Sequence, residues 1–128
     1  MKNPLLLILV VEDDDLIKEM VHEALSDAGF QSKVVASGEE AVTLLQDKYD
    51  EYRALVTDIN LRGELSGWDV AKRARELSPD IPVVYMTGAA ANQWPSHGVP
   101  NSVLLQKPFA PAQVVTATSQ LLNQTVHE

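Results

Sequence analysis

The chain has 128 residues, and its 18 aspartates and glutamates outnumber 10 lysines and arginines, which gives a formal charge of −8. This length fits one domain, and the acid excess argues against nucleic acid or an anionic membrane surface as a partner. Without cysteine, the chain can form neither a disulfide nor a thiolate metal site. Its longest apolar run, 5–11, is far shorter than the roughly 20 residues of a membrane span, and acids follow it where a leader peptide would be cleaved. We expect one unprocessed, cytoplasmic domain over residues 1–128.

Short apolar runs alternate along the chain with segments whose apolar residues recur at helical spacing. The runs predict five strands, at 5–11, 32–36, 53–57, 82–86 and 103–105. The helical patterns lie at about 17–28, 37–45, 68–77 and 111–122. Asp14 or Asp15 is expected to cap the first helix, and Ser37 with Glu40 has the spacing of a capping box for the second.

The stretch from Ala89 to Asn101 is the weak part of this pattern. Pro95, Gly98 and Pro100 leave room there for about one or two helical turns. We therefore expect an irregular or shortened fourth helix. Strands that alternate with helices predict an α/β fold, in which right-handed crossovers place helices on both faces of a parallel sheet.

Polar residues follow four of the predicted strands directly. Glu12 and Asp13 follow the first strand, Asp58 the third, Thr87 the fourth and Lys107 the fifth. Ligands of open α/β sheets bind at the carboxyl ends of the strands, so these five residues are expected to share one site.

Three carboxylates at one edge repel one another and require a cation. Oxygen ligands suit Mg²⁺, with Mn²⁺ as an alternative, rather than zinc, and Mg²⁺ commonly joins carboxylates to a phosphate. A carboxylate in such a site can act as a nucleophile and form an aspartyl phosphate. Lys107 and Thr87 would then neutralise and hydrogen-bond the transferred group.

These segments together resemble the receiver domain of two-component response regulators. The resemblance rests on four motifs in order, at 7–14, 56–61, 83–88 and 106–109, and it extends over about 5–122. It implies a flavodoxin-like, doubly wound sheet of five strands in the order 2-1-3-4-5. It also implies that Asp58 takes a phosphoryl group from a phosphohistidine on a sensor histidine kinase or a phosphotransfer protein.

The resemblance assigns further roles residue by residue. Asp13 and Asp58 match direct metal ligands, Glu12 matches a ligand that acts through water, and the backbone carbonyl of Asn60 matches one that completes the metal shell. Thr87 matches the switch hydroxyl of the family. Lys107 matches its lysine, whose peptide bond to the following proline is commonly cis in relatives.

Three positions depart from the family pattern. Leu104 stands where an aromatic switch residue is usual, and Arg62 stands where a proline usually follows the phosphoacceptor. Gly67 comes one residue later than is common, which indicates a loop longer by one residue. We expect intact phosphorylation chemistry and an altered output route.

Other functions remain as alternatives. An aspartyl-phosphate phosphatase would have a second aspartate where Asn60 stands, and a flavodoxin would have a phosphate loop where this chain has acids. A degenerate or phosphate-sink receiver acting as an adaptor is the third alternative, which the intact Asp58, Thr87 and Lys107 disfavour. We expect a signalling domain that is not an enzyme on other substrates. Because the receiver pattern fills the chain, its output is expected to pass to an unidentified downstream protein.

Some residues allow both a packing and a binding interpretation. Trp68 is expected to pack partly buried beside the site loop, whereas Trp94 is equally suited to packing and to an interface. Lys72, Arg73 and Arg75 predict a basic patch, which is a solvated face by default and a kinase-docking surface as the alternative.

Overall fold

One sheet of five parallel strands, in the order β2-β1-β3-β4-β5, forms the centre of the molecule. The computed structural model describes residues 5–126, so the first four and last two residues of the predicted 1–128 domain lie outside the described part. The strands are β1 (Leu7–Val11), β2 (Gln31–Val35), β3 (Tyr52–Asp58), β4 (Val83–Thr87) and β5 (Ser102–Gln106). The helices are α1 (Asp15–Asp27), α2 (Gly38–Lys48), α3 (Gly67–Leu77), α4 (Trp94–His97) and α5 (Pro111–Val126), with single 3-10 turns at Tyr49–Glu51 and Ala91–Gln93. The predicted doubly wound α/β architecture and its strand order are confirmed.

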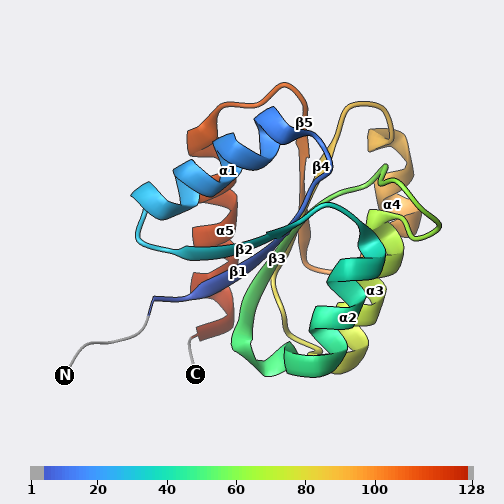
Figure 1. Ribbon diagram of the computed structural model, residues 1–128, viewed down its shortest axis with the longest axis horizontal. Helices are drawn as coiled ribbons and strands as arrows, with labels where there is room; N and C mark the ends of the chain where they lie inside the picture. Colours follow the sequence, from blue (N-terminus) through green and yellow to red (C-terminus); the bar gives the residue numbers. More distant parts are fainter. Residues whose placement is uncertain (1–4, 127–128) are drawn as a thin grey trace.

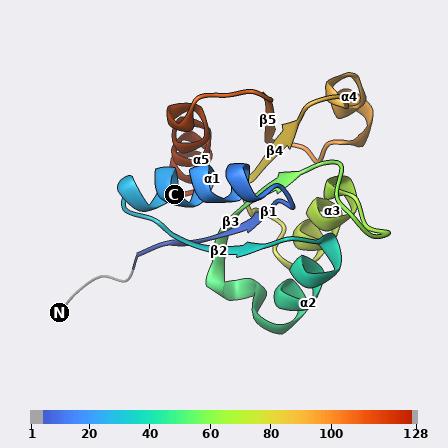
Figure 2. The same cartoon turned by 45° about the horizontal axis from the view of Figure 1, so that its top comes forward.

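Helices cover both faces of this sheet. In Figure 1, α1 and α5 lie on one side of the strands and α2 and α3 on the other, and Figure 2 shows the same layers from a second direction. Strand β1 contributes to both cores: Ile8 and Val10 pack in the core with α1 and α5, and Leu9 and Val11 pack in the core with α2 and α3. A strand buried on both faces must be apolar at every position, which explains its continuous apolar run.

Side chains cap three of the helices. Asp14 accepts hydrogen bonds from the Leu16 and Ile17 amides at the start of α1, and Ser37 accepts one from the Glu40 amide at the start of α2. A full capping box starts α3, where Ser66 and Asp69 each accept a hydrogen bond from the other's backbone amide. No helix within residues 5–126 has both the length and the hydropathy that a bilayer span requires.

The fourth helix is short, as predicted. It consists of a 3-10 turn followed by four helical residues, Trp94–His97, with Pro95 in its first turn. The Trp94 indole Nε1 donates to Ser102 Oγ at 2.9 Å, which ties this segment to β5. The prediction that Arg75 belongs to a solvated basic patch is wrong. Its guanidinium donates to the carbonyls of Ile81 and Pro100, each at 2.7 Å, and so joins α3 to the segments that lead into β4 and β5.

Candidate functional site

The carboxyl ends of four strands bring the predicted site residues to one edge of the sheet. Strand β3 ends at Asp58 and β4 at Thr87, while Glu12 and Asp13 follow β1 directly and Lys107 follows β5. The parallel register aligns these ends, because Val11 is paired with Thr57 and Asp58 is paired with Met86. The parallel topology therefore positions the site, whose side chains come from the last residue of a strand or from the residues directly after it.

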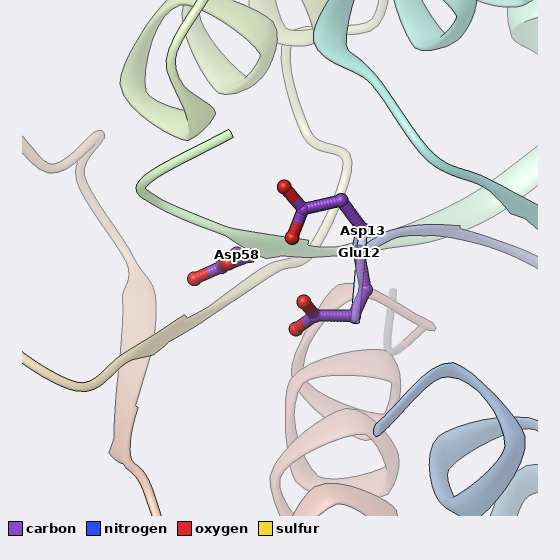
Figure 3. Close-up of side chains that lie close together, drawn as sticks. All are labelled: Glu12, Asp13 and Asp58. Atoms are coloured by element: carbon purple, nitrogen blue, oxygen red, sulfur yellow. The ribbon is translucent and has the colours of Figure 1, made fainter. Parts of the chain in front are cut away.

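Three carboxylates gather at this edge. Glu12, Asp13 and Asp58 each present an oxygen, and these oxygens all lie within 4.8 Å of one another. Figure 3 shows the three side chains, two from the end of β1 and one from the end of β3, with their carboxylates turned to the same side. Three negative charges this close repel one another, so the cluster favours a bound cation or a proton.

Lys107 supplies a positive charge to two of these carboxylates. Its Nζ lies 2.9 Å from Glu12 Oε1 and 3.3 Å from Asp58 Oδ2. Glu12 is fully buried, and the Lys107 side chain is one-fifth exposed at 20%. Lys107 is also the only Lys, Arg, Asp or Glu of the sequence between residues 81 and 127. Its peptide bond to Pro108 is cis, as the resemblance implied.

Backbone amides hold the second carboxylate oxygen of Glu12 and of Asp58. Glu12 Oε2 accepts from the Asp14 amide at 3.0 Å, so both oxygens of Glu12 are engaged. Asp58 Oδ1 accepts from the Ile59 amide at 2.9 Å, which leaves Oδ2 on the side of Lys107. These bonds fix the direction of both side chains before any ligand binds.

Burial and charge shift the protonation of the cluster. Burial raises the pKa of Glu12 above its ordinary value, although the hydrogen bonds from Lys107 and Asp14 oppose the shift. Burial likewise raises the pKa of Asp58, against the opposing charge of Lys107. For Lys107, burial works to lower the pKa, but the hydrogen bond to Glu12 and the charge of Asp58 outweigh it, and the net shift is upward. The lysine is therefore held in its charged form, whereas both carboxylates bind protons more readily than usual.

Thr87 and Asn60 lie in different surroundings. Thr87 is fully buried, and its Oγ accepts hydrogen bonds from the amides of Ala89 at 3.1 Å and Ala90 at 2.7 Å. Since a hydroxyl has two lone pairs and one hydrogen, its hydrogen stays available to donate. Asn60 is exposed in the loop after β3, and the role of its carbonyl stays a prediction.

Comparison with known proteins decides the family. The family model described as "Response regulator receiver domain" matches residues 8–119. The chain belongs to the response regulator receiver family. Receiver domains are signalling modules of two-component systems. The response regulator receiver protein CpdR of Brucella abortus is 32% identical over 117 residues, which span 90% of this chain and 95% of CpdR.

Solved receiver structures share the fold. A response regulator receiver protein from Sinorhizobium medicae is 42% identical, with a TM-score of 0.90 over 93% of this chain and 95% of that one. The receiver domain of the Pseudomonas aeruginosa sensor histidine kinase PA1611, which was crystallised with magnesium in its active-site cleft, is 22% identical, with a TM-score of 0.80 over 94% of this chain and 99% of that one. Other curated relatives are longer: the chain spans about half, 49%, of the response regulator SaeR of Staphylococcus epidermidis.

The departures from the receiver pattern have definite places in the structure. Leu104 is paired in register with Tyr85 and packs, half-buried, against the core on the α2–α3 side. Gly67 begins α3 directly against β3, and its amide donates to the Ile59 carbonyl at 2.8 Å.

Arg62 reaches the site, with its Nε 3.4 Å from Asp13 Oδ2. Sequence reasoning noted Arg62 as a departure but missed this contact. A cation in the loop after a phosphoacceptor is the signal that could have indicated it.

The two tryptophans both take part in packing. Trp68 is 6% exposed, and its ring lies 4.7 Å from that of Tyr85 between ring centroids, so the expected burial is confirmed. Trp94 is half-buried and packs against the same core. Both indole rings therefore belong to the packing on the α2–α3 side of the sheet.

Proposed function

We propose that Asp58 accepts a phosphoryl group from a sensor histidine kinase or a phosphotransfer protein in a reaction that requires Mg²⁺, with Mn²⁺ as a substitute. The observation that carries this proposal is the pairing of the buried Asp58 carboxylate with Lys107 inside a cluster of two further carboxylates. A nucleophile, a fixed cation and a set of oxygen ligands in one place are the parts that phosphoryl transfer needs. The domain then signals by contact with a downstream protein.

The donor set of the cluster suits a magnesium ion. Its oxygens are carboxylate oxygens, the ligand type that Mg²⁺ prefers, and they are close enough together to contact one ion. Asp13 and Asp58 would hold the ion directly and the Asn60 carbonyl would add a ligand. In keeping with the family pattern, Glu12 would act through water. When bound, Mg²⁺ supplies charge neutralisation to these carboxylates and to the phosphoryl oxygens. The PA1611 receiver, which holds magnesium in its cleft, supports this reading.

The transfer itself needs a nucleophile and hydrogen-bond donors. An Asp58 carboxylate oxygen forms the new bond to phosphorus, the bond from phosphorus to the histidine nitrogen breaks, and that nitrogen keeps the electron pair. The Lys107 ammonium and the Thr87 hydroxyl donate to the oxygens of the transferred group, where negative charge accumulates. Because the phosphoryl group stays on Asp58, the domain catalyses only its own phosphorylation and dephosphorylation.

The Thr87 hydroxyl connects this chemistry to the surface. Its oxygen holds the amides of Ala89 and Ala90, which lead directly into the 3-10 turn and α4. If the hydroxyl turns toward the phosphoryl group, its hydrogen bonds from these two amides weaken. The segment 89–97 would then shift and change the surface that a downstream protein contacts.

Acetyl phosphate tests the proposal without knowledge of the partner kinase. We expect incubation with acetyl phosphate and Mg²⁺ to add one phosphoryl group, measured as intact mass, and chelation of Mg²⁺ by EDTA to prevent it. Asp58→Asn should abolish the addition. Asp50→Asn, which removes an exposed carboxylate after α2, is the matched control and should react like the wild type. An unmodified wild-type mass, or full modification of Asp58→Asn, would contradict the proposal.

A further inference from the structure

The three carboxylates of the site divide between two cations. Lys107 contacts Glu12 and Asp58, whereas the partner of Asp13 is Arg62, at 3.4 Å. The Arg62 side chain is 84% exposed, and the Asp13 side chain is 20% exposed. Arg62 therefore stands on the open side of the cluster, where a small ion would enter, while Lys107 stands on the buried side.

The backbone that carries Arg62 is anchored on both sides. Glu39, in the first turn of α2, accepts hydrogen bonds from the amides of Glu64 at 2.9 Å and Leu65 at 3.2 Å. These bonds lower the pKa of Glu39 and keep it an acceptor at neutral pH. Upstream, the Ile59 amide donates to the Met86 carbonyl of β4. These hydrogen bonds on either side of Arg62 hold its backbone close enough to Asp13 for the guanidinium to make the 3.4 Å contact, although the side chain extends into solvent.

A cation in this place opposes a second cation. A divalent ion that binds Asp13 must either displace the guanidinium or share the carboxylate with it, and in both cases it meets a like charge. We infer that Arg62 is a built-in competitor for the divalent cation at Asp13 and lowers the metal affinity of this site. This inference rests on the proposed metal role of Glu12, Asp13 and Asp58.

Coulomb's law gives the size of the effect. A unit charge and a divalent ion on the order of 6 Å apart in a solvent-like dielectric, screened by about 0.1 M salt, repel enough to change affinity about threefold to fivefold. Removal of the charge should therefore tighten Mg²⁺ binding by that factor. The difference should shrink at about 1 M salt, where the screening length is only about 3 Å.

Calorimetric titration of the metal-free protein with MgCl2 measures this directly. We expect Arg62→Gln to bind Mg²⁺ about threefold to fivefold more tightly than the wild type, and Arg62→Lys, which keeps the charge, to stay near the wild type. Lys48→Gln removes the same charge from the last turn of α2, next to the start of β3 at the opposite edge of the sheet, and should leave the Kd unchanged. Arg62 is an exposed loop residue, so its variants should fold normally.

The possible outcomes separate the two proposals. A wild type that takes up no Mg²⁺ would contradict the metal site itself and the proposed function with it. A wild type that binds Mg²⁺, with Arg62→Gln equal to it or weaker, would overturn the role of Arg62 and leave the metal site standing. A gain in Arg62→Gln that Lys48→Gln matches, or that persists unchanged at high salt, would also overturn it.

Discussion

Gly67 begins α3 directly against the end of β3, the strand that carries Asp58. A Cβ at Gly67 would lie 2.1 Å from the Asp58 carbonyl oxygen, 2.8 Å from the Ile59 Cα and 2.9 Å from the Asp58 carbonyl carbon. All three are backbone atoms at the end of β3, so no side chain can rotate away. Gly67→Ala must therefore move α3 or the end of β3 by about 1 Å, and overpacking of this kind costs roughly 1–3 kcal/mol or more.

Two effects compete in this substitution. Alanine is the better helix former, and its gain over glycine is about 1 kcal/mol at most. The steric clash is larger, and we expect a net loss of about 2 kcal/mol in the free energy of unfolding. For a domain of this size, that loss lowers the Tm by roughly 7 °C. Mg²⁺ binding should weaken as well, because Asp58 moves with its backbone.

Gly88 provides the matched control for Gly67. It follows β4 at the same edge of the sheet, and a Cβ there would meet no atom within 4 Å. We expect Gly88→Ala to stay within about 0.5 kcal/mol of the wild type in urea and thermal unfolding. The steric reasoning fails if Gly67→Ala is as stable as the wild type, or if Gly88→Ala loses as much stability as Gly67→Ala.

Two further experiments test the electrostatics of the site. Lys107→Met leaves the buried Glu12 without its cation, so we expect a loss of about 2–3 kcal/mol in urea unfolding at pH 8, most of which Glu12→Gln should restore in the double variant; a double variant no more stable than Lys107→Met would contradict this. The pKa of Asp58 is raised in the folded protein, so its ionised form disfavours folding, and Asp58→Asn should raise the Tm of the metal-free protein at pH 8. That gain should shrink as the pH is lowered toward the raised pKa of the wild-type carboxyl, which then takes up its proton. A gain that grows as the pH is lowered would show the opposite sign of the shift.

The sequence was sufficient to predict the sheet and most of the site. Continuous apolar runs identify strands buried on both faces, and parallel strands necessarily bring their carboxyl ends, and hence Glu12, Asp58 and Lys107, to one edge. Strand ends were less well predicted. The first strand begins at Leu7 rather than Leu5, because pairing with β2 starts at Leu7 and Leu5 is half exposed.

Contacts between residues distant in sequence could not be predicted. Glu39 binds amides about two dozen residues away, which depends on how α2 and the loop after β3 meet in three dimensions. Arg75 looked like a surface charge, yet it donates to the carbonyl of Pro100, which lies 25 residues away in the sequence and comes near only in the folded chain. No local pattern encodes such contacts, because long polar side chains reach whatever backbone the packing places beside them.

Chemical trapping identifies the phosphoacceptor, which we propose to be Asp58. Borohydride reduces an aspartyl phosphate to homoserine, so protein treated with acetyl phosphate and Mg²⁺ can be reduced, digested and sequenced by mass spectrometry. We expect homoserine at position 58, only when Mg²⁺ is present. Homoserine at another carboxylate, or none after full treatment, would show that Asp58 is not the phosphoacceptor.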